Sequence, residues 1–240
     1  MSLCGPTSSP SRVATKRLRA SAAMVAAGIS YWCAAAAPAG QRSEPTVACA
    51  NLVYSGTRTA VCFSDRFLTR LAAETTIRVA PRFVKVRLDD AAALSSHPFA
   101  IMSGEGAFAL SDRERANLRR FLTRGGFLVA SAGCSNPDWA RSFRSELGRV
   151  LPGKALQRIP PDHPLFRTVY LIRSLDTAQR RGRAPAVLEG LSMEGRLVLV
   201  FSADGLNDTR NARNCCCCGG DEIVNAEFVN VNLMAYALLH

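Results

Sequence analysis

The sequence contains only three histidines, His97, His163 and His240, which leaves few candidates for an imidazole base or a metal ligand. It has no glycine-rich phosphate loop and no dinucleotide fingerprint, so no motif indicates a nucleotide site. After residue 39, no segment approaches about 18 uninterrupted apolar residues, the length that predicts a membrane-spanning helix. Acidic residues are also few. The 19 Asp and Glu stand against 30 Lys and Arg, and the formal net charge of +11 favours anionic partners but indicates no specific nucleic acid.

The composition that remains is that of a globular protein. Apolar residues make up 48% of the 240 residues and charged residues 20%, which excludes collagen, a coiled coil and wholesale disorder. A chain of this length can bury a substantial core. We find no internal repeat and no long linker, so we predict a single α/β domain over residues 40–240.

The first 39 residues have the pattern of an export leader. Residues 1–19 are basic and rich in Ser and Pro, residues 20–37 are apolar and rich in Ala, and Ala37-Pro38-Ala39 is a small-x-small site. This order of regions is typical of a signal peptide. We therefore predict an exported protein, periplasmic or membrane-associated in a bacterium, with no stable membrane span after cleavage. An uncleaved anchor and a misassigned start remain alternatives.

Strand and helix patterns alternate along the rest of the chain. Alternation of this kind indicates an α/β fold with a mostly parallel sheet and helices on both faces. Ligands of such sheets bind beyond the carboxyl ends of the strands. Apolar runs predict strands at 51–54, 83–88, 98–103, 127–132 and 197–201. Helices are expected after Ser64, after the capping-box pair Ser111 and Glu114, from Pro137, and at 231–238.

Three predicted strand ends supply candidate ligand-binding residues. Gly104, Glu105 and Gly106 follow the third predicted strand, and the amides of such a turn can approach a ligand closely and hold an oxyanion. Ser135 follows the fourth strand. Asp204 follows the last one, where its carboxylate would orient an imidazole or a water. A plain turn at each strand end remains the alternative.

Cys134 and His163 are the candidate catalytic pair. Cys134 leaves a buried strand and precedes a helix, whose N-terminus would lower the pKa of its thiol and favour a nucleophilic thiolate. His163 follows Asp162, a further candidate ligand-binding residue, in a proline-rich loop and is the best candidate for a general base. We expect Cys134 and His163 to face one cleft within about 10 Å, a looser reach than direct contact. Packing at the strand end and a structural hydrogen bond are the respective alternatives.

The most unusual feature is a run of four cysteines, Cys215, Cys216, Cys217 and Cys218, which polar and glycine-rich flanks place on a surface loop. Nine cysteines occur in all, and an odd number of them follow the predicted leader, so they cannot all pair internally. Disulfides that would involve Cys49, Cys62 and some of the run are one expectation, and plain loop thiols and redox catalysis stay open. Because thiolates bind soft metals, a zinc or copper site is a further alternative, although no cofactor is certain.

Five segments together resemble a known bacterial family, the domain of unknown function 4159. They are residues 99–108, 118–129, 162–166, 195–202 and 231–238, and the resemblance covers roughly residues 52–240. That family is similar to class I glutamine amidotransferases and, more loosely, to trehalose-utilisation proteins. The resemblance implies a flavodoxin-like α/β fold. It also implies that a glutaminase nucleophile would stand in the turn after 127–132, where this chain has Cys134.

The glutaminase pattern itself is incomplete. A glutaminase elbow reads Gly-x-Cys-x-Gly, whereas Ala132 and Asn136 stand here in place of the two glycines. No histidine lies between His163 and His240, so the expected His-x-Glu pair is missing. We therefore expect an exported, non-catalytic amidotransferase-like domain that binds a small ligand or a protein partner. A Cys134/His163-dependent hydrolase or transferase, and a metal-binding protein using residues 215–218, are the alternatives.

Overall fold

The computed structural model describes residues 46–177, 185–212 and 222–240. The predicted leader and the cysteine run at 215–218 lie outside these ranges. The described strands form one seven-stranded sheet in the order β2-β1-β3-β4-β7-β6-β5. They are β1 (Cys49–Val53), β2 (Val84–Arg87), β3 (Phe99–Gly104), β4 (Phe127–Ala132), β5 (Gln157–Arg158), β6 (Leu188–Met193) and β7 (Arg196–Ser202).

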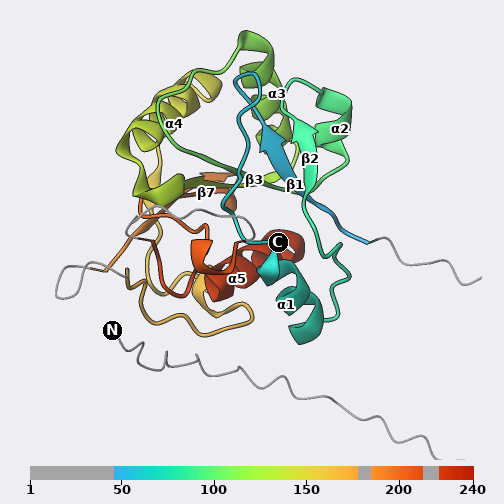
Figure 1. The fold of residues 1–240 in the computed structure, drawn as a ribbon, viewed down its shortest axis with the longest axis vertical. Helices are drawn as coiled ribbons and strands as arrows, with labels where there is room; N and C mark the ends of the chain where they lie inside the picture. Colours follow the sequence, from blue (N-terminus) through green and yellow to red (C-terminus); the bar gives the residue numbers. More distant parts are fainter. Residues whose placement is uncertain (1–45, 178–184, 213–221) are drawn as a thin grey trace, which may run out of the picture.

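The sheet is mostly parallel, as the sequence predicts (Figure 1). β2, β1, β3, β4 and β7 run parallel to one another, whereas β6 is antiparallel to β7 and β5 is antiparallel to β6. All residues of β4 are buried, and so are nearly all of β3 and β7. Strands buried on both faces need continuous apolar runs, which is the pattern that predicted these three.

The antiparallel end of the sheet is not predicted by the sequence pattern. Glu189 and Ser192 interrupt the apolar residues of β6, so this strand lacks a clear periodicity. A two-residue turn joins β6 to β7, and both of its residues, Glu194 and Gly195, have positive φ values of 51° and 78°. Such a turn matches the twist of an antiparallel hairpin. The hairpin therefore extends the parallel sheet by β6, and β5 adds to its edge.

Three helices begin close to the predicted positions. The helix expected at 231–238 begins earlier, at Ala226, and the short helix Ala91–Ser95 was not predicted. The capping box of α3 is confirmed: Ser111 Oγ accepts from the Glu114 amide at 3.3 Å, and Glu114 Oε2 accepts from the Ser111 amide at 2.7 Å. The expected cap of α1 shifts by one residue, because Asp65 is its N-cap. The helices are α1 (Arg66–Glu74), α2 (Ala91–Ser95), α3 (Asp112–Thr123), α4 (Pro137–Val150) and α5 (Ala226–Leu239), with short 3-10 helices η1 (Gly133–Ser135), η2 (Pro164–Arg167) and η3 (Thr209–Asn211).

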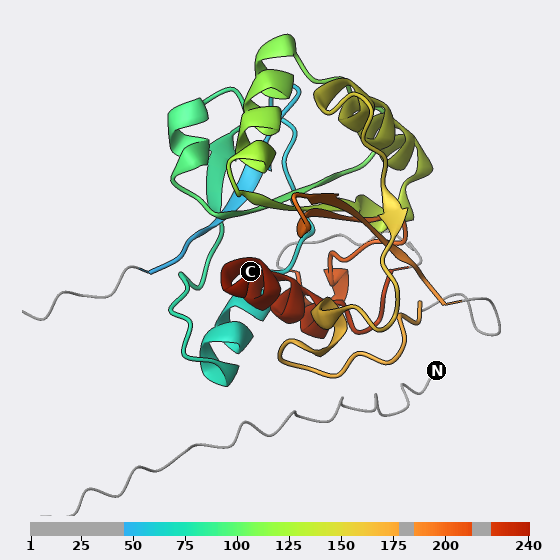
Figure 2. The ribbon, with the colours of Figure 1, turned by 180° about the vertical axis from the view of Figure 1, so that it is seen from behind.

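Helices cover both faces of the sheet (Figures 1 and 2). α2, α3 and α4 lie on one face, over a core that includes Leu128 and Phe201. α1 and α5 lie on the other, over a core that includes Val129 and Val200. α5 is buried over most of its length because α1 and η2 pack against it, which explains its apolar character on all sides. In the described ranges, no helix is both long and apolar enough to cross a bilayer.

Candidate functional site

The carboxyl ends of the parallel strands meet along one edge of the sheet. β1 is flanked by β2 on one side and β3 on the other, so the order of strands reverses at β1 and β3. Ligands of open α/β sheets bind outside the strand ends at such a switch point. The segments that follow β1, β3, β4 and β7 are therefore where a site would be formed.

The ends of β3 and β4 pack closely together. A side chain at Gly133 would place its Cβ 2.9 Å from the carbonyl oxygen of Gly104 and 3.2 Å from Cγ of Glu105. The amide of Gly106 donates to Asn136 Oδ1 at 3.0 Å, and the same oxygen accepts from the amide of Trp139 at 3.0 Å. Asn136 is the N-cap of α4, so the Gly106 amide, a candidate oxyanion donor, already serves the helix start.

Cys134 lies where the resemblance places a nucleophile, between β4 and α4. Its φ and ψ of 51° and 33° are left-handed, a conformation uncommon for residues other than glycine. Its Sγ lies 3.2 Å from Glu105 Oε1. The cysteine is disulfide-bonded, and a disulfide sulfur is not the thiolate that nucleophilic catalysis requires.

The carboxylate of Glu222 lies near the backbone amide of Cys134. One oxygen of Glu222 accepts from the hydroxyl of Thr209 at 2.7 Å. Burial raises the pKa of Glu222, and the nearby charge of Glu105 raises this pKa further, whereas Thr209 and the amide of Cys134 lower it. An anionic group that approached the Cys134 amide would meet the carboxylate of Glu222.

Aromatic side chains fill the switch point between β1 and β3. Tyr54, at the end of β1, donates its hydroxyl to the carbonyl of Ser103 at 3.1 Å and accepts from Trp139 Nε1 at 2.6 Å. Both rings are fully buried, and burial raises the pKa of Tyr54 to about 12. Arg58 covers the turn after β3 by donating to the carbonyl of Glu105 at 2.7 Å. The crevice in which such a sheet would bind a ligand is thus occupied by the protein's own side chains.

The loop after β7 is fixed by buried hydrogen bonds. Asn207 Oδ1 accepts from Ser131 Oγ at 2.6 Å and from Ser103 Oγ at 3.1 Å, so it joins β3 and β4. Ser135 Oγ donates to the carbonyl of Asp204 at 2.8 Å. The predicted residues Glu105, Gly106, Ser135 and Asp204 therefore do gather at one place, together with Cys134.

His163 does not belong to this group. Its Nδ1 accepts from the amide of Leu165 at 3.2 Å, so it caps η2, and its ring packs on Tyr236 with 5.4 Å between centroids. Tyr236 in turn contacts Phe127, the first residue of β4, whereas Cys134 follows the last residue of β4. Six strand residues span about 20 Å.

These contacts place His163 beside the first residue of β4, whereas Cys134 lies beyond its last residue, which argues against the expected proximity of the two side chains within about 10 Å. Asp162, exposed and adjacent to His163, is separated from the carboxyl-edge residues in the same way. Partial burial of the imidazole lowers the pKa of His163, which suits a neutral ring that accepts a backbone hydrogen bond.

The remaining cysteines give no metal site in the described part of the chain. Among these residues, no group of three or more His, Cys, Asp or Glu side chains could hold a metal ion. Cys62 is disulfide-bonded, and Cys49 is a buried free thiol whose pKa is raised by burial. The zinc or copper prediction concerned residues 215–218, which lie outside the described ranges.

Four residues that fill or fix the carboxyl edge were not predicted as part of it from the sequence. They are Tyr54, Arg58, Trp139 and Asn207. Tyr54 and Asn207 follow buried strands, and that position was the available signal for both. Arg58 and Trp139 carry no local signal, because each acts on a residue far from it in the chain.

Comparison with known families adds one finding. The model of a family described as "Domain of unknown function (DUF4159)" matches residues 50–238, from β1 into α5. No curated protein matches the chain.

Proposed function

Because the chain belongs to the family of the domain of unknown function DUF4159, whose description gives no reaction, we propose a function from the geometry of the carboxyl edge. The protein is an exported, non-catalytic binding domain with a flavodoxin-like, amidotransferase-like fold. Its partner is a small ligand or another protein.

The strand order supports the fold part of this proposal. β2, β1, β3, β4 and β7 form a parallel sheet in which the fifth position is taken by the last strand of the chain. A 2-1-3-4-5 order with helices on both faces is the flavodoxin-like arrangement. The turn after β4, where the resemblance to glutamine amidotransferases puts a nucleophile, holds Cys134.

The packing of His163 beside the start of β4, whereas Cys134 follows its end, is the observation that carries the non-catalytic part. A nucleophilic cysteine needs a free thiolate and a base within hydrogen-bond reach. Here the sulfur is disulfide-bonded, and His163 lies beside the opposite end of β4. The carboxylate of Glu222 also lies near the neighbouring amide.

Two features support export. The basic start, the Ala-rich segment and the Ala37-Pro38-Ala39 site have the order of a cleavable leader. Cys62 and Cys134 are disulfide-bonded, and disulfides persist mainly in oxidising compartments. The metal-binding alternative depends on residues 215–218 alone, and no described residue favours it.

A glutamine analogue with a diazoketone in place of its amide tests the absence of glutaminase chemistry. Such a compound alkylates an activated cysteine in a glutamine pocket and adds a fixed mass to it. We expect no added mass on Cys134, with or without a reductant, because no base activates its sulfur. Labelling of the parent protein that Cys134→Ser abolishes would overturn the proposal.

A further inference from the structure

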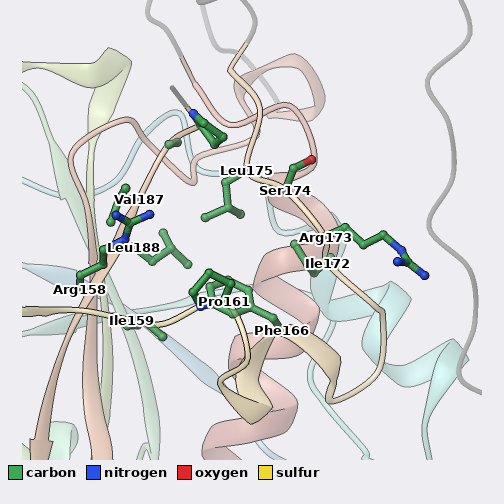
Figure 3. Close-up of a pocket in the computed structure, with 12 residues that line it drawn as sticks. Arg158, Ile159, Pro161, Phe166, Ile172, Arg173, Ser174, Leu175, Val187 and Leu188 are labelled. Atoms are coloured by element: carbon green, nitrogen blue, oxygen red, sulfur yellow. The ribbon is translucent and has the colours of Figure 1, made fainter. Parts of the chain in front are cut away.

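A pocket lies at the far end of the same sheet edge, beside β5 and β6 (Figure 3). β5 ends at Arg158, and β6 begins at Leu188, which pairs with Ser202 at the carboxyl end of β7. The pocket is therefore on the carboxyl side of the sheet but beyond β4 and β7, away from the filled switch point. The chain segments before β6 and around η2 enclose it.

The interior of this pocket is apolar. Of its twelve lining residues, nine have apolar side chains, and they include the buried Ile159, Phe166, Ile172, Leu175 and Leu188. The cavity volume is about 150 Å³. A dry apolar cavity of this size accepts a molecule as large as benzene, so it fits an apolar group of about six carbons.

The rim of the pocket is positively charged. Arg158 and Arg173 line it, and no acidic residue does. Within the described residues, neither guanidinium makes a hydrogen bond or an ion pair. Glu189, which faces Arg158 across the β5–β6 ladder, is paired with Arg144 instead. In Figure 3, Arg158 runs along the pocket wall beside Val187, and Arg173 points away from the pocket.

We propose that this pocket binds a small monocarboxylate whose apolar tail or ring, of about six carbons, fills the cavity. The carboxylate lies at Arg158, because a planar guanidinium pairs with a carboxylate through two parallel hydrogen bonds. This inference rests on the proposed function, since it names the ligand class of a non-catalytic binding domain. A neutral ligand of the same shape would lack this charge-assisted pair with Arg158.

Calorimetric titration of the full oxidised chain with hexanoate, and with hexanamide as the neutral match, tests the proposal. We expect hexanoate to bind at concentrations up to about 10 mM, the range for so small a ligand, and to bind more tightly than hexanamide. Arg158→Gln should weaken hexanoate binding about threefold to tenfold, because the arginine is solvent-exposed. Hexanamide binding should not change in that variant.

Arg173→Gln is the matched control, since it removes one charge from the same rim at a side chain that points away from the pocket. It should change hexanoate binding by less than about twofold, as for a screened surface charge. Equal weakening by both variants, or no binding of hexanoate to the parent, would refute the carboxylate site.

A pocket-filling variant separates the cavity from the general basic surface. Val187 is half-buried at the pocket wall, so Val187→Trp should abolish hexanoate binding while the circular dichroism spectrum stays that of the parent. Unchanged binding in a folded Val187→Trp protein would place the ligand elsewhere. Labelling of Cys134 by the diazoketone is read separately by mass, so failure of this site and failure of the proposed function are distinguishable.

Discussion

At the residue scale, Asp208 shows how burial changes the chemistry of a single side chain. Its carboxyl group is 9% exposed in the loop after β7, and Asn211 Nδ2 donates to both of its oxygens. Burial is the main cause that raises the pKa of Asp208 from 3.8 to about 6, and the nearby charge of Glu227 adds to it. The hydrogen bonds from Asn211, the charge of Arg66 and the hydrogen bond with Ser64 oppose this rise without cancelling it.

The raised pKa predicts that ionised Asp208 destabilises the folded protein. A folded-state pKa above the unfolded one means that the favourable neutral form is complete below about pH 4 and is lost as the pH rises through about 6. The difference of about two units corresponds to at most about 3 kcal/mol. Asp208→Asn should therefore raise Tm at about pH 7.5 by several degrees, and by much less at about pH 4. Asparagine also tolerates the positive φ of 51° at this position.

Thermal unfolding of parent and variant at the two pH values measures this effect. Asp176→Asn is the control, because Asp176 is exposed and its change should shift Tm little at either pH. A Tm difference for Asp208→Asn that is the same at both pH values would contradict the prediction.

At the scale of elements, α4 depends on one side chain that serves two segments. Asn136 Oδ1 accepts from the amide of Trp139 in the first turn of α4 and from the amide of Gly106 after β3. α4 in turn carries Trp139 into the switch point, where its Nε1 donates to Tyr54. The first turn of α4 therefore links the segments that follow β1 and β3 at the carboxyl edge of the sheet.

Removal of the Asn136 side chain should lower the free energy of unfolding by more than the loss of a helix cap alone, because a second amide also loses its acceptor. Asn136→Ala leaves both amides without their acceptor, and we expect the free energy of unfolding to fall by about 1–2 kcal/mol. Asn136→Asp keeps an acceptor oxygen and should stay close to the parent. Urea unfolding compares the three proteins; a loss in Asn136→Asp as large as that in Asn136→Ala would show that the acceptor is not the cause.

At the scale of the whole molecule, the state of the cysteines sets the stability of the fold. Cys62 and Cys134 are disulfide-bonded, and Cys49 is a free thiol with no exposed surface. A disulfide contributes about 2–4 kcal/mol by restricting the unfolded chain. The folded protein should therefore be more stable oxidised than reduced, which would agree with the proposed export.

A reductant should lower Tm by about 5 °C or more, since each kcal/mol shifts a domain of this size by about 2–4 °C. Scanning calorimetry with and without the reductant measures the shift. The double variant Cys62→Ser/Cys134→Ser should already have the lower Tm of the reduced parent, so the reductant should lower its Tm little further. An unchanged Tm for the reduced parent would contradict the prediction. Cys49 should remain unalkylated in each folded sample, because its thiol is buried.

The sequence by itself determined the features that depend on neighbouring residues. Continuous apolar runs identified β3, β4 and β7, because a strand buried on both faces has no polar side to show. The spacing of Ser111 and Glu114 identified the start of α3, because a capping box is formed within one turn. Parallel strands share a carboxyl edge, which is why Glu105, Cys134, Ser135 and Asp204 were expected together and are together.

Only the tertiary structure decided what that edge can do. Tyr54 and Trp139 fill the switch point through a hydrogen bond between residues 85 apart, and no local pattern reports such a contact. His163 lies beside the opposite end of β4 because its ring packs on Tyr236 of α5, a helix that runs back along the sheet. The pocket at Arg158 exists because β6 turns back on β7 and extends the sheet. Each depends on long-range packing, whose free energy comes from burying surfaces that are distant in the chain.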